Sequence, residues 1–197
     1  MVFIYIILAI AFYCFGCIST GYIVGKIKSN VDIRKYGSGS SGATNAFRVL
    51  GTKAGIITFI SDVVKGAVAS LVGLWVGGVT GAIVCSTAVV LGHNWPLFLK
   101  FKGGKGIATT TGTIIVLNPI IGMSLLGLGI LVIALTRYVS LGSIVATSAY
   151  PIVVFALQMP MEFKIHALIV CIFAILRHKS NIKRLIKGNE RKFGTRT

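Results

Sequence analysis

Acidic residues are scarce in this sequence. Its 197 residues include four Asp and Glu against twenty Lys and Arg. Phosphoryl or prenyl transfer through paired magnesium ions needs several carboxylates to hold the metals. We expect Asp32 to be isolated in a loop, Glu162 to lie on the far side and Glu190 to lie in a distal tail, which leaves only Asp62 near a common site. The sequence therefore predicts no metal site and no cofactor.

Motifs for a strong nucleophile or for nucleotide binding are also missing. No G-x-S-x-G elbow and no H-x-x-x-x-D pair occurs. The run GGKG does not fit a P-loop, because Lys105 is followed by Gly106 instead of Ser or Thr. Cys14 and Cys17 form a C-x-x-C inside an apolar stretch, where cysteine usually packs as a small hydrophobe. We therefore predict neither ATP binding nor a disulfide framework.

Apolar residues, by contrast, are abundant. They make up 55% of the chain, and the mean hydropathy is +0.89. Several runs approach or exceed the ~18 to 20 apolar residues that cross a bilayer. The first 25 residues lack a basic start and a cleavage site, so we interpret them as a retained span. The composition predicts a polytopic all-α membrane bundle that forms a single domain over residues 1–197.

We predict seven transmembrane helices, with turn signals at Gly77-Gly78, Asn118-Pro119 and Met159-Pro160. The fourth is the weakest, since its fourteen residues extend roughly 21 Å against a hydrocarbon core of ~30 Å. It either borrows flanking residues or is re-entrant. The expected spans cover residues 2–25, 54–76, 79–98, 105–118, 120–136, 139–158 and 164–177.

The basic residues gather on one predicted side of the membrane. With seven spans, eighteen of the twenty lie in alternate loops or in the tail after the last span. The positive-inside rule then places the N-terminus outside and the tail in the cytoplasm, in the cell inner (plasma) membrane. In the tail, Ile182, Leu185 and Ile186 form the apolar stripe of a short interfacial helix. No basic domain stands apart from the spans, so we expect membrane lipids as partners and no nucleic acid.

Three segments at this predicted cytoplasmic face are rich in glycine and hydroxyl residues. They are GSGSSGATNAFRVLG (37–51), FKGGKGIATT (101–110) and RYVSLGS (137–143), each beside the start of a span. Helix N-termini attract anions, and glycines allow backbone N–H groups to approach them closely. Arg48 and Lys105 add positive charge. One such loop is often a flexible connector, but three at one face predict a phosphate-binding site.

Polar residues within and next to the spans are either structural or part of the site. Asp62 and Lys65 stand three residues apart and can form a structural ion pair. His93 is either an interface residue or part of the site, and we expect His166 to be structural. His178 and Asn181 share a helix face after the last span.

Four ordered segments carry a resemblance to a known family. GSGSSGATNAFRVLG, GHNWPLFLKFKGGKGIAT, RYVSLGSI and RHKSNIKRLIKGNE resemble the signature segments of the bacterial acyl-phosphate:glycerol-3-phosphate acyltransferases. The resemblance extends from about residue 16 to 193. The family's first segment usually reads G-S-G-N, whereas Ser40 stands here in place of Asn, a shorter donor that can alter substrate affinity.

The resemblance implies a seven-span enzyme that moves a fatty acyl group from acyl phosphate to the sn-1 hydroxyl of glycerol 3-phosphate. The products are lysophosphatidate and phosphate, at the first committed step of phospholipid synthesis. Neither coenzyme A nor acyl carrier protein would be the direct donor. The enzyme that produces acyl phosphate is a further implied partner.

The resemblance also implies roles for individual residues. The proton acceptor stays open between the phosphate of the donor itself and His178. By matching position, Ser38, Arg48, Lys105 and Ser143 should hold phosphate; His178 and Asn181, with Lys105, should act in catalysis by orienting the hydroxyl; Thr44, Asn45 and His93 should surround the site; and Gly103, Gly104 and Gly106 should shape an anion nest.

Two other functions remain open at this point. An anion or phosphate transporter would hold its binding residues near the midplane, often within repeated halves. The sequence has no clear repeat, and its polar residues gather at one end. A non-catalytic membrane scaffold would tolerate changes at Arg48 and Gly104.

Overall fold

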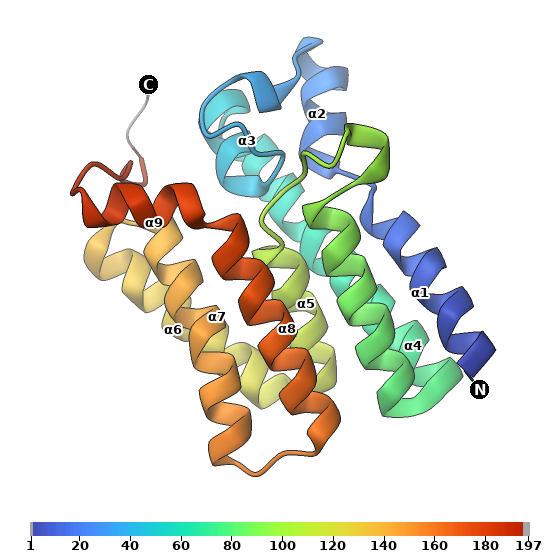
Figure 1. The fold of residues 1–197 in the computed structure, drawn as a ribbon. Coiled ribbons are helices and arrows are strands. Elements are labelled where there is room, and N and C mark those ends of the chain that lie inside the picture. The colour runs from blue at the N-terminus through green and yellow to red at the C-terminus, as the bar shows by residue number, and fades with distance from the viewer. Residues whose placement is uncertain (1, 195–197) are drawn as a thin grey trace.

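The computed structural model describes residues 2–194, which fold into α-helices joined by short loops and two 3-10 turns (Figure 1). Met1 and residues 195–197, including Arg196 of the predicted basic tail, lie outside the described residues. The helices are α1 (Val2–Gly16), α2 (Thr20–Ser29), α3 (Ala43–Leu50), α4 (Thr52–Asn94), α5 (Ile107–Leu117), α6 (Pro119–Thr136), α7 (Val139–Ala156), α8 (Met161–Arg177) and α9 (Lys179–Ile186), and the 3-10 turns are η1 (Ile33–Lys35) and η2 (Leu97–Leu99).

The predicted all-helical class is confirmed. Four segments within residues 2–194 are long and apolar enough to cross a membrane: Val2–Ser29, Thr52–Leu99, Pro119–Thr136 and Val139–Ala156. The weak fourth span corresponds to α5, which has only eleven residues. The count of seven spans therefore stays a prediction.

Helix α4 is a helical hairpin with its bend at the predicted Gly77-Gly78 turn. Both glycines leave helical geometry, and Gly78 has a φ of +60°. The two arms then run back along each other, so the hydroxyl oxygens of Ser70 and Ser86 lie 2.6 Å apart. A Cβ on Gly73 would collide with the carbonyl oxygen of Gly81. These small residues allow the close approach of the arms.

The predicted span over residues 2–25 falls within the candidate span Val2–Ser29, but it is not one continuous helix, because the chain unwinds between α1 and α2. The Lys65 ammonium donates to the carbonyl oxygens of Gly16 (3.3 Å) and Ile18 (2.9 Å) at this break. It thereby satisfies carbonyl groups at the end of α1 that lack helical partners. The break is thus stabilised by a residue in α4 that is distant in sequence.

The loops of the predicted cytoplasmic face gather at one end of the bundle. In Figure 1, α2, α3, α9 and the loop after α4 lie at the top, opposite the start of α1. The short helix predicted after the last span is α9. All four cysteines are free, as expected. Buried side chains from α5 to α8 form a core below the loops that consists of Ile114, Ile121, Leu125, Tyr150, Val154, Ala167 and Val170.

Candidate active site

A cavity of about 440 Å³ opens at the loop end of the bundle and extends down between α5, α6 and α7. Its mouth is polar and positively charged, and its lower part is apolar. The mouth includes Ser38, Thr44, Arg48, Lys105, Ser140, His178, Asn181, Arg184, Glu190 and Arg191, and the lower part includes Ile114, Gly122, Leu125, Leu126, Gly129, Ile130 and Ile133.

Lys105 projects from the loop just before α5. The following Gly106 has a φ of +77°, and a Cβ there would press against the Asn94 side chain, so glycine is required. The Lys105 ammonium donates a 2.6 Å hydrogen bond to Oδ1 of Asn181. Burial lowers the pKa of Lys105 to about 8, although Glu190 opposes this. Lys105 is therefore mostly charged at neutral pH.

Glu190 lies in the mouth of the cavity, not in a distal tail, so that expectation is wrong. Its carboxylate accepts hydrogen bonds from Nδ2 of Asn181 (2.7 Å), Nε of Arg184 (2.7 Å) and the hydroxyl of Ser140 (3.0 Å). Burial raises the pKa of Glu190, but these hydrogen bonds outweigh it and bring the pKa below its usual value. Lys105, Asn181 and Glu190 thus form one continuous chain of hydrogen bonds.

The tail reaches the cavity because it reverses direction after α9. Gly188 has a φ of +68°, and its N–H donates to the carbonyl oxygen of Leu185 at 3.1 Å. Further on, the N–H of Phe193 donates to the carbonyl oxygen of Arg137 at 2.7 Å. The Phe193 ring packs on Phe47 of α3 with centroids 4.9 Å apart. These contacts fix the segment that carries Glu190.

His178 joins α8 to α9 and is buried. Its Nδ1 lies 2.8 Å from the carbonyl oxygen of Ala174. Because that oxygen can only accept, Nδ1 carries the proton and Nε2 is left as an acceptor. Burial lowers the pKa of His178 to about 4, and the Lys105 charge adds to this effect. His178 is therefore neutral at pH 7 and a weak base.

Arg48 lines the mouth from α3, as Glu190 and Arg191 do from the tail. Burial lowers the pKa of Arg48, the Arg191 charge lowers it further, and the Glu190 charge raises it. The guanidinium remains charged at neutral pH, because arginine starts from a pKa of about 12.5 or above. The mouth thus combines several cations with a single engaged carboxylate.

Asn45 organises the loop between α2 and α3. Its Nδ2 donates to the carbonyl oxygens of Ile33 (2.9 Å) and Ser40 (2.8 Å), and its Oδ1 accepts from the N–H of Ser38 (2.8 Å). The Ser40 hydroxyl accepts from the N–H of Gly42 at 3.2 Å. Asn45 therefore places the backbone of Ser38 and Ser40 at the cavity wall.

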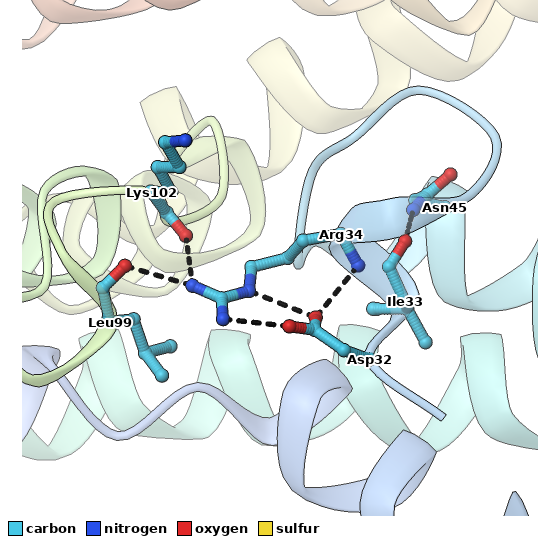
Figure 2. Close-up of polar contacts among 6 residues, drawn as sticks. All are labelled: Asp32, Ile33, Arg34, Asn45, Leu99 and Lys102. Carbon is cyan, nitrogen blue, oxygen red and sulfur yellow. Dashed lines mark hydrogen bonds and ion pairs between the residues drawn. The ribbon is translucent and has the colours of Figure 1, made fainter. Parts of the chain in front are cut away.

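Arg34 attaches this loop to the segment that follows α4. Figure 2 shows its guanidinium between Asp32 and two carbonyl oxygens of that segment. It donates to the oxygens of Leu99 (2.8 Å) and Lys102 (3.4 Å) and pairs with the Asp32 carboxylate at 2.8 Å. Asp32 was expected to be isolated, which is wrong. Two loops far apart in sequence are therefore joined directly.

Gly103 and Gly104 lie behind the cavity wall and are not among its lining residues. The N–H of Gly104 donates to the carbonyl oxygen of His93 at 3.1 Å. The carbonyl oxygens of Gly103 and Gly104 accept from Arg177 at 3.0 and 2.9 Å. Neither glycine has room for a Cβ, and a Cβ on Gly104 would collide with the His93 ring. They shape the loop that presents Lys105.

The remaining predicted residues line the cavity. Ser143 does so from α7, where its hydroxyl donates to the carbonyl oxygen of Val139 at 2.9 Å. His93 and Asp62 lie on the inner wall. The predicted ion pair is present, with Nζ of Lys65 3.1 Å from Oδ1 of Asp62. Within residues 2–194, no group of three or more His, Cys, Asp and Glu side chains could hold a metal ion.

Comparison with known proteins decides which family this arrangement belongs to. The model of the family described as "Glycerol-3-phosphate acyltransferase" matches residues 6–188. The chain belongs to this family. The resemblance carried by the four segments is thereby confirmed, and this membership favours an enzyme over the transporter.

Curated glycerol-3-phosphate acyltransferases from Thermoanaerobacter sp. (strain X514) and Clostridioides difficile (strain 630) are 47% and 44% identical to it over 192 and 202 residues. Both alignments cover 98% of this chain and 97% of the relative.

Solved structures agree with this membership. The crystal structure of PlsY (YgiH), an integral membrane glycerol 3-phosphate acyltransferase, in its glycerol 3-phosphate form has a TM-score of 0.92 and 36% identity to this chain. The match covers 97% of this chain and 96% of the other. The lysophosphatidic acid form has a TM-score of 0.89. This chain is therefore a membrane glycerol-3-phosphate acyltransferase.

Four polar residues of the cavity mouth escaped the sequence reasoning: Ser140, Arg184, Glu190 and Arg191. Glu190 and Arg184 belong to the fourth signature segment, so their signal was present. The overlooked feature was Gly188, a residue suited to reversing the chain after a short helix.

Proposed function

We propose that this acyltransferase uses acyl phosphate as donor and acylates the sn-1 hydroxyl of glycerol 3-phosphate, releasing lysophosphatidate and phosphate. The observation that carries the proposal is the form of the cavity, which joins a cationic mouth to an apolar groove. Such a cavity suits a donor with a phosphate at one end and an alkyl chain at the other.

The mouth suits two phosphate-bearing substrates. Arg48, Lys105, Arg184 and Arg191 supply four cationic side chains, of which Arg184 is engaged with Glu190. In the proposed arrangement, Ser38, Arg48, Lys105 and Ser143 hold the phosphate groups. His178 and Asn181 lie beside Lys105, so the attacking hydroxyl would be oriented next to the phosphate of the donor.

The groove suits a long acyl chain. Its wall on α6 consists of residues spaced three and four apart on one helix face. From Ile133 to Gly122 this wall runs for about 16 Å at the usual helical rise. One leaflet of a ~30 Å hydrocarbon core has a similar thickness, about 15 Å. We therefore infer that chains of the length found in membrane lipids fill the groove.

The proposed reaction needs no covalent enzyme intermediate. The hydroxyl oxygen attacks the carbonyl carbon of the mixed anhydride, the bond from that carbon to the phosphate oxygen breaks, and phosphate leaves. The hydroxyl proton passes to the phosphate, because His178, with a pKa of about 4, is a poor acceptor. His178 and Asn181 orient the hydroxyl so that its single proton faces the phosphate, and Lys105 and Arg48 stabilise the departing charge.

We also propose seven membrane crossings, with α2, α3, α9 and the cavity mouth at the cytoplasmic face of the inner membrane and the N-terminus outside. The two arms of α4 count as two crossings in this topology. The convergence of the predicted basic loops at the end that holds the cavity supports this orientation.

A donor comparison tests the proposal. Purified protein in lipid nanodiscs is given glycerol 3-phosphate with palmitoyl phosphate, palmitoyl coenzyme A or palmitoyl acyl carrier protein. We expect lysophosphatidate from palmitoyl phosphate alone. Equal or faster product formation from either thioester would overturn the donor assignment, and a 2-acyl product would overturn the sn-1 assignment.

A further inference from the structure

A second charged cluster lies beneath the cavity mouth, between the arms of α4. Asp62, Lys65 and His93 are 2%, 5% and 5% exposed. Nζ of Lys65 lies 3.1 Å from Oδ1 of Asp62 and 3.2 Å from Nδ1 of His93. Nδ1 of His93 lies 3.5 Å from the same carboxylate oxygen. Burying such charges is costly and seldom improves stability over apolar packing, so the cluster calls for another explanation.

Lys65 connects the cluster to the break between α1 and α2. Besides Asp62 and His93, its ammonium contacts the carbonyl oxygens of Gly16 and Ile18. The ammonium has three N–H groups, and four polar atoms lie within 3.3 Å of its nitrogen. Lys65 does not line the active-site cavity. Any influence of Lys65 on substrate must pass through its neighbours.

His93 connects the cluster to the loop that carries Lys105. Its carbonyl oxygen accepts from the N–H of Gly104 at 3.1 Å, and its ring fills the space beside the Gly104 Cα. Lys105 is the next residue, and its ammonium meets Asn181 at 2.6 Å. The position of His93 therefore determines where the backbone before Lys105 can lie.

We propose that Asp62, Lys65 and His93 act together as positioning residues that fix the Gly103–Lys105 loop, and through it the Lys105 ammonium, against the break between α1 and α2. Lys65 fastens the cluster to the bundle, Asp62 balances its charge, and His93 supports the loop. The proposal rests on the function of Lys105 proposed above. It assigns no contact with substrate to Lys65.

Binding of glycerol 3-phosphate without any acyl donor tests this. Calorimetry in nanodiscs compares the wild type with Lys65→Met, His93→Asn and the two combined. A loop displaced by about 1 Å can cost on the order of a hundredfold in rate, so we expect each single variant to raise Kd about tenfold or more. Because Lys65 and His93 act through the same cluster, their effects should not add. The combined variant should have about the same Kd as whichever single variant binds more weakly.

Two further variants make the result specific. Asp62→Asn combined with Lys65→Met removes both charges and guards against unfolding caused by an unpaired carboxylate. It should show the same rise in Kd. Ser70→Ala removes a buried contact between the same arms of α4 farther from the loop, and it should leave Kd unchanged. Size-exclusion elution and thermal melting report whether each variant is folded.

Three results would overturn the proposal. The first is an unchanged Kd in folded Lys65→Met or in the variant that combines Asp62→Asn with Lys65→Met. The second is additive effects of Lys65→Met and His93→Asn on Kd. The third is unfolding of every cluster variant, which would mean that the cluster supports the fold. A wild-type protein that binds glycerol 3-phosphate but makes no lysophosphatidate from acyl phosphate would count against the donor assignment alone.

Discussion

The mouth and the groove of the cavity are built in opposite ways. In the mouth, Lys105, Asn181 and Glu190 come from three separate segments and meet through hydrogen bonds of 2.6 and 2.7 Å. In the groove, neighbouring turns of α6 supply apolar side chains to one wall. The mouth therefore depends on the identity of each member, whereas the groove depends mainly on the volume that its side chains leave free.

Among the changes in the mouth, Lys105→Ala should lower activity most. Removing the ammonium deletes the charge proposed to stabilise the departing phosphate and leaves Asn181 without its donor. We expect kcat/KM to fall about a hundredfold or more, as for other groups that stabilise transition-state charge. Steady-state assays with palmitoyl phosphate measure this. Lys102→Ala is the matched control, since its side chain is exposed in the same loop, and comparable losses in both variants would refute a specific function for Lys105.

Glu190→Gln should have a smaller effect. The amide keeps the shape and can still accept from Asn181, but it loses the charge that pairs with Arg184. Hydrogen bonds to charged groups contribute about 1.5 to 3 kcal/mol, so we expect kcat/KM to fall roughly ten- to a hundredfold. Wild-type kinetics in Glu190→Gln would mean that the carboxylate only occupies space.

Ala146→Leu should affect the groove and leave the mouth intact. The Ala146 Cβ lies opposite Gly129, where a Cβ would come within 3.3 Å of it. A larger side chain would fill the middle of the groove. We expect the rate with palmitoyl phosphate to fall several-fold, by about 1 kcal/mol for each displaced methylene, while octanoyl phosphate is affected less. Ala134→Leu, on an exposed position of α6, is the control, and an unchanged chain-length profile in Ala146→Leu would place the acyl chain elsewhere.

The smallest predicted effect concerns pH. With a pKa of about 8, Lys105 is protonated below that pH and loses its charge above it. Activity that needs the ammonium should therefore be highest below pH 8, reach about half near pH 8 and fall further beyond. His178, with a pKa of about 4, contributes no transition between pH 6 and 8. Lys105→Arg, whatever its absolute rate, should remove the alkaline decline, and a decline that persists there would assign it to another group.

Sequence reasoning succeeded where local turn signals, or the side of the membrane on which each loop falls, were sufficient. Glycines at 77 and 78 interrupt an apolar run, so the bend in α4 was predictable. Counting spans placed the segments of Lys105 and Asn181 on the same side, and the resemblance to the family assigned both residues to one site, where their side chains meet at 2.6 Å. The prediction needed no knowledge of how the helices pack.

It failed where one distant side chain decides the local structure. Residues 2–25 are mostly apolar. Gly16, Ser19 and Thr20 lie at the break, but the sequence does not show that Lys65 stabilises it from another helix. Glu190 was misplaced because a polar tail carries little periodicity, although Gly188 offered a chain reversal. In both cases the deciding contact joins segments whose separation in sequence hides it.

The bridge made by Arg34 has a consequence for building chimaeras within this family. Its guanidinium joins the segment 32–34 to the carbonyl oxygens of Leu99 and Lys102 (Figure 2). A graft that imports residues 30–42 from a relative without arginine at position 34 would leave these two carbonyl oxygens without their donor. Exchanging residues 97–102 alone should be tolerated better, because every residue supplies a backbone carbonyl oxygen.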